Sequence, residues 1–549
     1  MLSFFTLFWA NMFYRLSFTL SIVCFTLSIL NPSFYPPWSS FISEYLAFLS
    51  LLLLLPLFFK KTISIPKISL FFILVSIIPV AQYFLGQIFY FDKAALAFIY
   101  IVSFWLAIVV GFNSLDRYKY SLDYFYWVIL GCGIISSLLA TAQWFNVEMS
   151  IDWVMQASSR PFANMAQPNH LATFLLLSLM SCLYFYENKK INNTALLLFS
   201  LLLLTVIAMT HSRTAWVALL FIYLYLGISY KRNIINLSLK KQSLLLAYFA
   251  VAAILLPLLK ASGLKLDTAV AITQRSSSIL ERIQIWQQGI AAIKYQPLWG
   301  YGWNQSSFAQ YETFQIDYAK RYTTSFHNIF LDIIIWCGIP IGITIILFCS
   351  FIIIKALLKS VSAAQICLIT SVCVILIHAL LEFPLSYSYF LLPLGFMLGA
   401  LFFTFDVKSI KVSGLYSALI FILGMGLSVY IVREYSYIPD NMVAAETHEM
   451  NERKDMIIFP YQFHFFDTFE SRARWIGLYP CTKLSNSHIE EIRYMVKTYM
   501  IHYDLYKFSE VLYFNGYNNE AQKHLDMLNY MYEEEIKLSD LQCTGNQQS

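Results

Sequence analysis

The chain contains little charge for its length. Of its 549 residues, 13% are Asp, Glu, Lys or Arg and 58% are hydrophobic. A soluble chain of this size needs about twice that share of charge to cover its surface. The mean hydropathy of +0.61 therefore excludes an ordinary soluble globular protein and predicts a membrane protein.

Several motifs of common chemistry are missing as well. The nine cysteines form no CxxC pair, and no His/Cys cluster has the spacing of zinc ligands. Cys481 and Cys543 lie in the polar tail, where an oxidising compartment would allow them to form a disulfide. The N-terminus lacks a polar segment followed by a small-residue cleavage site, so we expect it to be a retained first span.

Long apolar runs dominate the chain. A transmembrane helix needs roughly 20 mostly apolar residues, and about 13 runs meet this requirement. The chain is thus expected to be an all-α polytopic membrane protein. The runs centre near residues 16–31, 43–59, 68–86, 94–112, 123–143, 170–186, 194–210, 214–230, 243–259, 329–354, 364–381, 388–405 and 413–432.

Lysine and arginine gather in every second short loop. By the positive-inside rule these loops are cytoplasmic, and the odd number of spans then places the N-terminus in the cytoplasm and the C-terminus in the periplasm. We therefore expect a multi-pass protein of the bacterial inner membrane. The basic residues are Lys60, Lys61, Lys67, Arg117, Lys119, Lys189, Lys190, Lys231, Arg232, Lys240, Lys241, Lys355, Lys359, Lys408 and Lys411.

The longer connections divide the chain into two expected domains. Residues 1–432 would form a transmembrane catalytic domain with a first outer loop at 144–169 and a large periplasmic loop at 260–328. Residues 433–549, richer in charge, would form a helical periplasmic domain. A TPR-like helix pair is one interpretation of this tail, but no clean repeat is present and we favour a plain helical cap. Helical patterns cover Ser277–Lys294, Ile489–Met500, Leu505–Phe514 and Asn518–Ile536, with a break at 515–517.

The first outer loop carries a dense polar cluster just before a span. From Arg160 to His170 it reads Arg-Pro-Phe-Ala-Asn-Met-Ala-Gln-Pro-Asn-His. A polar cluster at a span entrance must be satisfied by water, protein or ligand. Helix capping by Asn169 after the proline turn is one explanation. Because capping leaves Arg160, Asn164 and Gln167 unexplained, we interpret these side chains as parts of a binding site.

Two further arginines lie on the same predicted face. Arg213 lies in the short connection between spans seven and eight, and Arg282 lies in the large outer loop. A lone arginine there would most simply reach lipid head groups, but its combination with Arg160 favours an anion site. Farther along, the Trp-Gly-Tyr-Gly-Trp segment at 299–303 would let a ligand approach the backbone at its glycines and would offer aromatic faces to sugar rings. No strand–turn–helix context surrounds it, which excludes a dinucleotide fingerprint.

His327, Glu382 and Tyr387 complete this face. His327 opens an apolar helix, where a neutral imidazole can act as a general base, although a hydrogen-bonded structural histidine is the alternative. Glu382 and Tyr387 lie between spans eleven and twelve, and a solvated interfacial carboxylate is the alternative for Glu382. Arginines bind phosphate in a bidentate manner, so the whole set suits a diphosphate. These loops hold no acidic pair or DxD-like motif for a divalent metal.

The motifs, in this order, resemble those of the O-antigen ligase superfamily. The resemblance rests on the run at 160–170, the Ser-Arg-Thr-Ala turn at 212–215, the glycine segment at 299–303, the Phe-His-Asn helix start at 326–328 and the Glu-Phe-Pro-Leu-Ser-Tyr loop at 382–387. The first and last are most similar to bacterial protein O-oligosaccharyltransferases of the PglL type. Phe383 replaces a tyrosine common in that family, so a tyrosine role there belongs to Tyr387 or is absent.

The resemblance implies an activity and a set of roles. It implies a GT-C-like membrane glycosyltransferase that moves a glycan en bloc from undecaprenyl diphosphate to Ser/Thr of a periplasmic or pilin-like protein, by an inverting, metal-independent displacement. His327 matches an essential histidine, and Gln167 a residue needed for activity. The remaining expected roles are diphosphate binding by Arg213 and Arg282, shaping of the donor site by Arg160, Asn164, Gln167 and Asn169, and a place on the acceptor side for Glu382 or Tyr387.

Two other functions stay open. Within the superfamily, the acceptor could be lipid A core, as in an O-antigen ligase, or a growing glycan, as in a polymerase. A transporter of lipid-linked sugars is an alternative of another class, and it requires ionisable residues near span centres, which are nearly absent here. The expected partners are the lipid-linked oligosaccharide, the acceptor protein and membrane lipid, with no cofactor and no nucleic acid.

Overall fold

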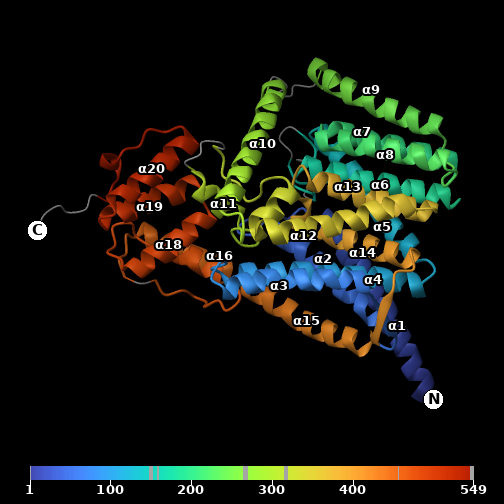
Figure 1. The fold of residues 1–549 in the computed structure, drawn as a ribbon, viewed down its shortest axis with the longest axis horizontal. Helices are drawn as coiled ribbons and strands as arrows, with labels where there is room; N and C mark the ends of the chain where they lie inside the picture. Colours follow the sequence, from blue (N-terminus) through green and yellow to red (C-terminus); the bar gives the residue numbers. More distant parts are fainter. Residues whose placement is uncertain are drawn as a thin grey trace, which may run out of the picture. The chain divides into compact units, whose positions relative to one another are not determined.

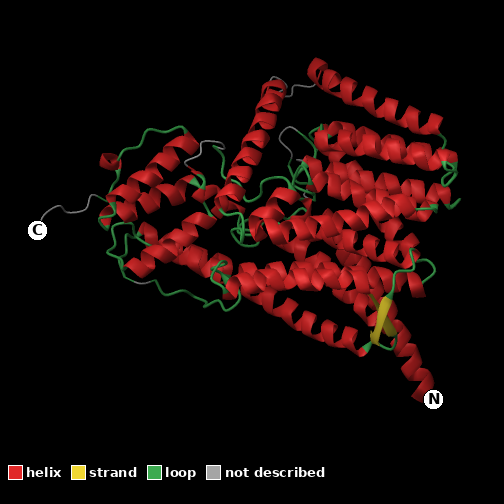
Figure 2. Ribbon diagram, in the orientation of Figure 1, coloured by secondary structure: helices red, strands yellow, loops and turns green. Residues whose placement is uncertain are grey.

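The computed structural model is built almost wholly from helices, with one pair of short strands (Figure 2). It describes residues 2–147, 153–156, 160–263, 270–314, 320–455 and 457–543. Parts of the predicted first outer loop (148–152, 157–159), large outer loop (264–269, 315–319) and tail (456, 544–549) lie outside the described residues.

Every predicted span coincides with a helix. Among the described residues, ten helices are long and apolar enough to cross a membrane, and three shorter apolar helices, α7, α13 and α14, cover the remaining predicted spans. The prediction of an all-α polytopic membrane protein is therefore confirmed. In Figure 1 these helices are α1 (Leu2–Leu30), α2 (Phe41–Leu54), α3 (Leu70–Phe84), α4 (Phe91–Arg117), α5 (Ser121–Trp144), α6 (Pro168–Glu187), α7 (Asn193–Met209), α8 (Arg213–Lys231), α9 (Leu239–Gly263), α12 (Ile329–Lys359), α13 (Ala363–Ala379), α14 (Ser388–Thr404) and α15 (Leu415–Ser436).

One span differs from the prediction. The run at 329–354 was expected to be continuous, but α12 is interrupted at Gly338, whose φ of 76° and ψ of 168° are not helical. Pro340 follows two residues later and has no backbone N–H to donate, so it reinforces the break. The segment before Gly338 is thus a short helical piece that precedes the membrane-length part of α12.

The chain forms two compact units. The first contains Met1–Leu74, Tyr100–Gln274 and Phe348–Ser428, and the second contains Val75–Ile99, Arg275–Leu347 and Val429–Ser549. Within the first unit, α6 packs against α5, α7, α8 and α13 and is almost fully enclosed by them. The predicted domain boundary at 432 stays a prediction.

The basic loops of the first unit meet one another. Strand β1 (Thr62–Pro66) pairs antiparallel with β2 (Ser409–Ser413), which joins the loops that follow spans two and twelve. Lys61 donates to the Tyr118 hydroxyl at 2.8 Å, and Lys190 forms an ion pair with Asp123, so the loops after spans four and six join the same group. Lys241 then donates to Asn193 Oδ1 at 2.5 Å and adds the loop after span eight. Five of the six loops predicted to share one membrane side therefore lie together.

The second unit contains the helices predicted in the tail and the large loop. The predicted pattern at Ser277–Lys294 lies within α10, and the three tail patterns correspond to α18, α19 and α20. Gly516, with a φ of +87°, forms the predicted break between α19 and α20. Consecutive tail helices pack on one another. The helices of this part are α10 (Val270–Tyr295), α11 (Ser306–Glu312), α16 (Ile438–Met450), α17 (Asp467–Gly477), α18 (Asn486–Thr498), α19 (His502–Phe514) and α20 (Asn518–Tyr532).

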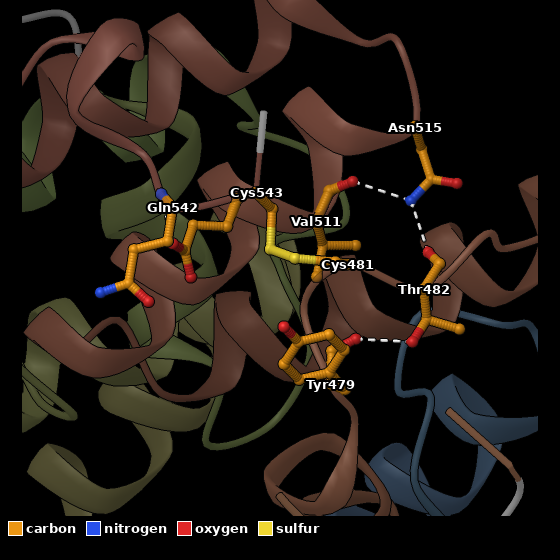
Figure 3. The surroundings of a disulfide bond; sticks show 8 residues. Tyr479, Cys481, Thr482, Val511, Asn515, Gln542 and Cys543 are labelled. Atoms are coloured by element: carbon orange, nitrogen blue, oxygen red, sulfur yellow. Dashed lines mark hydrogen bonds between the residues drawn. A yellow bond between two sulfur atoms is a disulfide. The ribbon is translucent and has the colours of Figure 1, made fainter. Parts of the chain in front are cut away.

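The expected disulfide is present in this unit. Cys481 and Cys543, 62 residues apart in sequence, are bonded to each other (Figure 3). Nearby, Asn515 at the end of α19 donates to the Thr482 carbonyl at 3.0 Å and to the Val511 carbonyl at 2.8 Å. The disulfide and these hydrogen bonds hold the segment before α18 against α19 and the end of the described chain.

A buried histidine joins the tail to the large loop within the second unit. His524 on α20 is 1% exposed, and its Nε2 lies 2.8 Å from the hydroxyl of Tyr311 on α11. Its Nδ1 lies 2.8 Å from the Glu520 carbonyl, which makes Nδ1 the donor and Nε2 the acceptor from the tyrosine. Both ring nitrogens are satisfied only when the imidazole is neutral.

Because His524 is buried, we expect the stability of the second unit to fall at acidic pH. Burial lowers the pKa of His524 to about 4, below the 6.5 of an exposed histidine. The unfolded chain takes up the proton at a higher pH than the folded chain does. The contribution of neutral His524 to the free energy of unfolding is therefore fully present above about pH 6.5 and is lost as the pH falls toward 4. The loss amounts to about 3 kcal/mol. Hydrogen exchange of α20 in the full-length protein should accelerate over this range. His524→Gln should flatten this dependence, and an unchanged profile in that variant would contradict the assignment.

Candidate active site

Three of the predicted polar clusters meet at the N-terminal end of α6 in the first unit. Arg160 donates through Nε to the Thr210 carbonyl at 2.7 Å and through Nη2 to Asn169 Oδ1 at 3.4 Å. Asn169 in turn donates to Glu382 Oε1 at 3.2 Å. Thr210 ends α7 and lies three residues before Arg213. The loop before α6, the α7–α8 turn and the α13–α14 connection are thus tied together by side chains.

Two alternative explanations from the sequence are wrong. Asn169 does not cap α6, because the helix begins at Pro168 and its side chain binds Arg160 and Glu382 instead. Glu382 is not a solvated carboxylate, since its side chain is buried at 7% exposure. Burial of a charged carboxylate requires compensating donors, and Asn169 supplies one of them.

Arg213 occupies the first position of α8. Ser212 caps this helix by accepting from the Ala215 amide at 3.4 Å, and His211 enters the turn with a φ of 49°. The N-terminus of a helix carries partial positive charge, so a cation at this position is unfavourable by itself. The same arrangement becomes favourable once an anion binds there, because the arginine and the positive end of the helix then act on it together. The geometry therefore suits a phosphate group.

Asn164 has a different role from its neighbours in the loop. It is 5% exposed, and its Nδ2 donates to the Leu30 carbonyl at 2.6 Å and the Trp153 carbonyl at 3.0 Å. Its Oδ1 accepts from the Met155 amide at 3.2 Å. With both polar atoms occupied by backbone groups, Asn164 fixes the shape of the loop.

Gln143, which was not among the predicted site residues, holds the same loop. Its Nε2 donates to the Met155 and Ala163 carbonyls, each at 2.7 Å, and its Oε1 accepts from the Phe162 and Ala163 amides at 2.9 and 2.7 Å. These bonds retain Ala163 at a φ of 52°, a conformation that costs a non-glycine residue roughly 1–2 kcal/mol.

The side chain of Gln167 differs from those of its polar neighbours in its hydrogen bonding. It is half-buried at the N-cap of α6, yet its side chain does not cap the helix. Among the residues that the structure describes, none forms a hydrogen bond with the side-chain amide of Gln167. Gln167 thus differs from Asn164 and Gln143, whose side chains are hydrogen-bonded to the described backbone, and its binding role stays a prediction.

Tyr387 lies at the start of α14 beside a buried acid. Its ring centroid is 4.6 Å from that of His170, and Glu44, 2% exposed, accepts from the Ser388 amide at 2.7 Å and from the Tyr100 hydroxyl at 2.9 Å. Burial, with the charges of Glu44 and Glu382, raises the pKa of Tyr387 to about 12 and keeps its phenol a hydrogen-bond donor. Sequence reasoning missed Glu44, although an acid near the end of an apolar run is a usable signal.

In the second unit, the glycine segment has a structural function. A side chain on Gly300 would meet the Ile335 carbonyl oxygen at 2.4 Å, and one on Gly338 would meet the Leu298 carbonyl oxygen at 2.1 Å. The segment hydrogen-bonds to the break in α12, with Tyr301 N donating to the Ile335 carbonyl at 2.8 Å. At Gly300 the close approach is therefore made by the backbone of α12 and not by a ligand, whereas for Gly302, which faces the side chains of Gln305 and Ile88, ligand access stays a prediction.

His327 is held in a strained loop ahead of α12. Its φ is 54°, and its amide donates to Ser325 Oγ at 3.0 Å. Ser325 donates in turn to Asp332 Oδ2 at 2.6 Å, while Asp332 Oδ1 accepts from Ser306 Oγ at 3.0 Å and from the Phe326 amide at 2.9 Å. The His327 side chain is half-buried. Asp332, which the sequence analysis missed, therefore holds the backbone of the turn that carries His327.

Asp332→Asn tests this positioning role. The amide keeps the size of the carboxylate but replaces one acceptor with a donor, so the bond from Ser325 is lost, at a cost of about 1.5–3 kcal/mol for a bond to a charged group. For the reaction that the resemblance assigns to His327, we expect kcat to fall by about tenfold or more with KM little changed. Asp440→Asn, which alters an exposed acid on α16, is the matched control. A rise in KM at constant kcat would contradict positioning.

Arg282 also belongs to the second unit. It lies on α10, half-buried, one turn before Trp286. Among the described residues, no group of three His, Cys, Asp or Glu side chains is arranged to hold a metal ion.

Comparison with known proteins decides the family. The O-antigen ligase family model matches residues 198–347, the protein glycosylation ligase model matches 161–185, and the model described as virulence factor membrane-bound polymerase, C-terminal, matches 366–542. Over 544 residues the chain is 33% identical to the general O-oligosaccharyltransferase of Acinetobacter baylyi, which covers 95% of this chain and 94% of that protein. The chain belongs to the O-oligosaccharyltransferase family.

A second relative agrees with this assignment. The chain is 30% identical over 370 residues to the ComP-specific O-oligosaccharyltransferase of the same organism, across 66% of each protein. The O-oligosaccharyltransferase described here is therefore a glycosyltransferase with multiple membrane helices. The matched regions contain the predicted site residues except Arg160, which lies just before residue 161.

Proposed function

We propose that the enzyme transfers a glycan en bloc from undecaprenyl diphosphate to Ser/Thr of a periplasmic or pilin-like protein. The observation that carries this proposal is the hydrogen-bonded set of Arg160, Asn169 and Glu382, tied to the turn before Arg213. Two arginines and a helix N-terminus favour an anionic group. The adjacent Gln167 amide adds a donor and an acceptor for a polar glycan or diphosphate oxygen.

The reaction is a single inverting displacement. The acceptor hydroxyl attacks the anomeric carbon, a new C–O bond forms, and the bond to the diphosphate oxygen breaks with its electron pair. His327 takes the proton of the hydroxyl, a contribution of roughly 10²–10⁴-fold. The strained loop that Asp332 holds supports this role, because an ordered loop keeps the imidazole in one orientation.

Arginines stabilise the leaving group. Arg213 and Arg282 are assigned to the diphosphate, whose negative charge grows as the glycosidic bond breaks. A well-placed donor is worth about 3–4 kcal/mol to such a transition state. In this mechanism the arginines neutralise the charge without a divalent metal.

The acceptor side is assigned to Tyr387 and Glu382. Tyr387 keeps its phenolic proton and can donate to the acceptor or the glycan. Glu382, already bound to Asn169, couples this side to the donor site. Asn164 acts through the loop that it fixes rather than by contact with substrate.

Two observations support the proposed orientation of the enzyme in the membrane. Five basic loops gather together in the first unit, and the positive-inside rule assigns such loops to the cytoplasm. The Cys481–Cys543 disulfide fits an oxidising compartment for the tail. We therefore place the N-terminus in the cytoplasm, the C-terminal helices in the periplasm and the enzyme in the bacterial inner membrane.

A growing glycan or lipid A core is the second candidate acceptor. The match of residues 366–542 to a membrane-bound polymerase family favours it, since this region contains Glu382 and Tyr387. The membership in a glycosyltransferase family argues against the transporter of lipid-linked sugars that the sequence left open.

Expression in a ligase-deficient host that carries a lipid-linked glycan separates these functions. We expect the mass of a co-expressed pilin-like protein to increase by one glycan on Ser or Thr, with no glycan added to lipopolysaccharide. Glycan on lipid A core or on longer polysaccharide, with an unmodified pilin, would overturn the protein acceptor. A host without the glycan is the control.

A further inference from the structure

An apolar cavity of about 640 Å³ lies inside the first unit, apart from the candidate active site. It is walled by side chains of α1, α2, α4, α5 and α14, among them Phe18, Ile22, Leu54, Val110, Val128 and Phe396. The polar groups on this wall are partly satisfied by one another, since Ser21 donates to the Ser50 carbonyl at 2.8 Å. The larger, apolar part of the wall suits a hydrocarbon chain.

The rim of the cavity is basic. Arg15, Lys60 and Lys61 line it, all three are exposed, and no acidic residue is among the lining residues. Lys61 is oriented by the Tyr118 hydroxyl at 2.8 Å. Among the residues that the structure describes, no carboxylate lies within ion-pair distance of these three cations. Their charge is therefore available to an anion.

The cavity opens at the opposite end of α2 from the active-site acid. Glu44, which accepts from the first amide of α14, lies in the first turn of α2, and Lys60 lies 16 residues later, beyond the C-terminal end of that helix. Lys60 and Lys61 directly precede β1, which joins two of the basic loops that we place on the cytoplasmic side. The occupant thus enters from the cytoplasmic leaflet, whereas the proposed donor site faces the periplasm.

We propose that this cavity binds an anionic phospholipid of the cytoplasmic leaflet. An acyl chain fills the apolar interior, and the phosphate head group binds Arg15, Lys60 and Lys61. The volume lies in the range of pockets that bind small molecules. Basic pockets between membrane helices on the cytoplasmic side suit acidic head groups. Because α1, α2 and α14 all line the cavity, the lipid also joins the helix that carries Glu44 to the helix that follows Tyr387.

Photolabelling of the full-length enzyme in nanodiscs tests the proposal. The nanodiscs contain equal parts of phosphatidylglycerol and phosphatidylcholine, and one of the two lipids carries a photoactivatable diazirine in its acyl chain. We expect the phosphatidylglycerol probe to label peptides of α1, α5 and α14 that line the cavity, several-fold more than the phosphatidylcholine probe does. Equal labelling by the two probes, or labelling spread evenly over the lipid-facing helices, would overturn the proposal.

Variants sharpen this test. Replacing Arg15, Lys60 and Lys61 with glutamine should reduce cavity labelling by about fivefold for each cation removed. The matched control removes one arginine and two lysines from other exposed positions in the basic loops, Lys231, Arg232 and Lys240, and should leave cavity labelling unchanged. Val128→Trp fills the cavity without altering charge and should reduce labelling as well. A loss of the same size in the control variant would refute the site.

Discussion

Replacing His327 with alanine is expected to lower the rate of glycan transfer by about 10²–10⁴-fold, the contribution of a general base. The imidazole is the group that we assign to the proton of the acceptor hydroxyl, and its loop is fixed by Ser325 and Asp332. The initial rate with purified enzyme, lipid-linked glycan and acceptor protein is the quantity to measure. KM for the donor should change little, because the imidazole acts mainly in the transition state.

The control for this variant is another histidine of the same unit. His488 is exposed at the start of α18, and His488→Ala should leave the rate unchanged. Formation of the Cys481–Cys543 disulfide in both variants reports that the second unit is folded. A normal rate in His327→Ala, with the disulfide intact, would remove His327 from the mechanism.

The second large effect is expected at Arg213. Arg213→Ala removes a donor from the helix N-terminus where we place the diphosphate, and such a loss costs about 10²–10³-fold in kcat. Arg213→Lys retains the charge but loses the planar fork that binds phosphate oxygens in pairs, so we expect a rate between those of wild type and Arg213→Ala. The measurement is kcat at saturating donor.

Arg232 supplies the matched control for Arg213. It lies at the opposite end of the same helix, at the C-cap of α8, and it is exposed. Arg232→Lys and Arg232→Ala should both leave kcat unchanged. If Arg213→Lys equals wild type while Arg213→Ala is inactive, a point charge suffices and the bidentate contact is contradicted.

Most of the fold follows from local sequence. Runs of about 20 apolar residues determine the spans, and turn residues such as Gly516 determine where the tail helices separate. The sequence marked Cys481 and Cys543, the two cysteines of the polar tail, as able to pair, and the structure shows the bond that the sequence left open. The interruption of α12 at Gly338 was not predicted, since the run remains long and apolar through Gly338 and Pro340 and the break also depends on packing against the segment around Gly300.

The candidate site was predicted in its composition but not in its contacts. Alternation of basic loops placed Arg160, Arg213 and Glu382 on one face, and the structure joins their loops. The sequence does not reveal which polar side chains form their hydrogen bonds within the protein. Asn164 and Gln167 look alike there, yet three backbone groups occupy Asn164 while Gln167 has no partner among the described residues.

Supporting residues were missed for the same reason. Gln143 acts on a loop 19 residues away, and Asp332 acts on the turn six and seven residues before it, where a single acid at the start of an apolar helix gives no sign of its partners. Glu44 accepts a hydrogen bond from the Ser388 amide at the start of α14, 344 residues farther along the chain. Long-range hydrogen bonds of this kind stabilise a site whose chemistry is contributed by other residues.

The central claim is the transfer of an intact glycan from undecaprenyl diphosphate to a hydroxyl of a protein. Its most direct test is the intact mass of a pilin-like acceptor after incubation with purified enzyme, purified undecaprenyl-diphosphate-linked oligosaccharide and a chelator of divalent metals. We predict an acceptor heavier by one whole glycan, linked to Ser or Thr with inverted anomeric configuration. An unmodified acceptor, or modification only when a divalent metal is added back, would contradict the account.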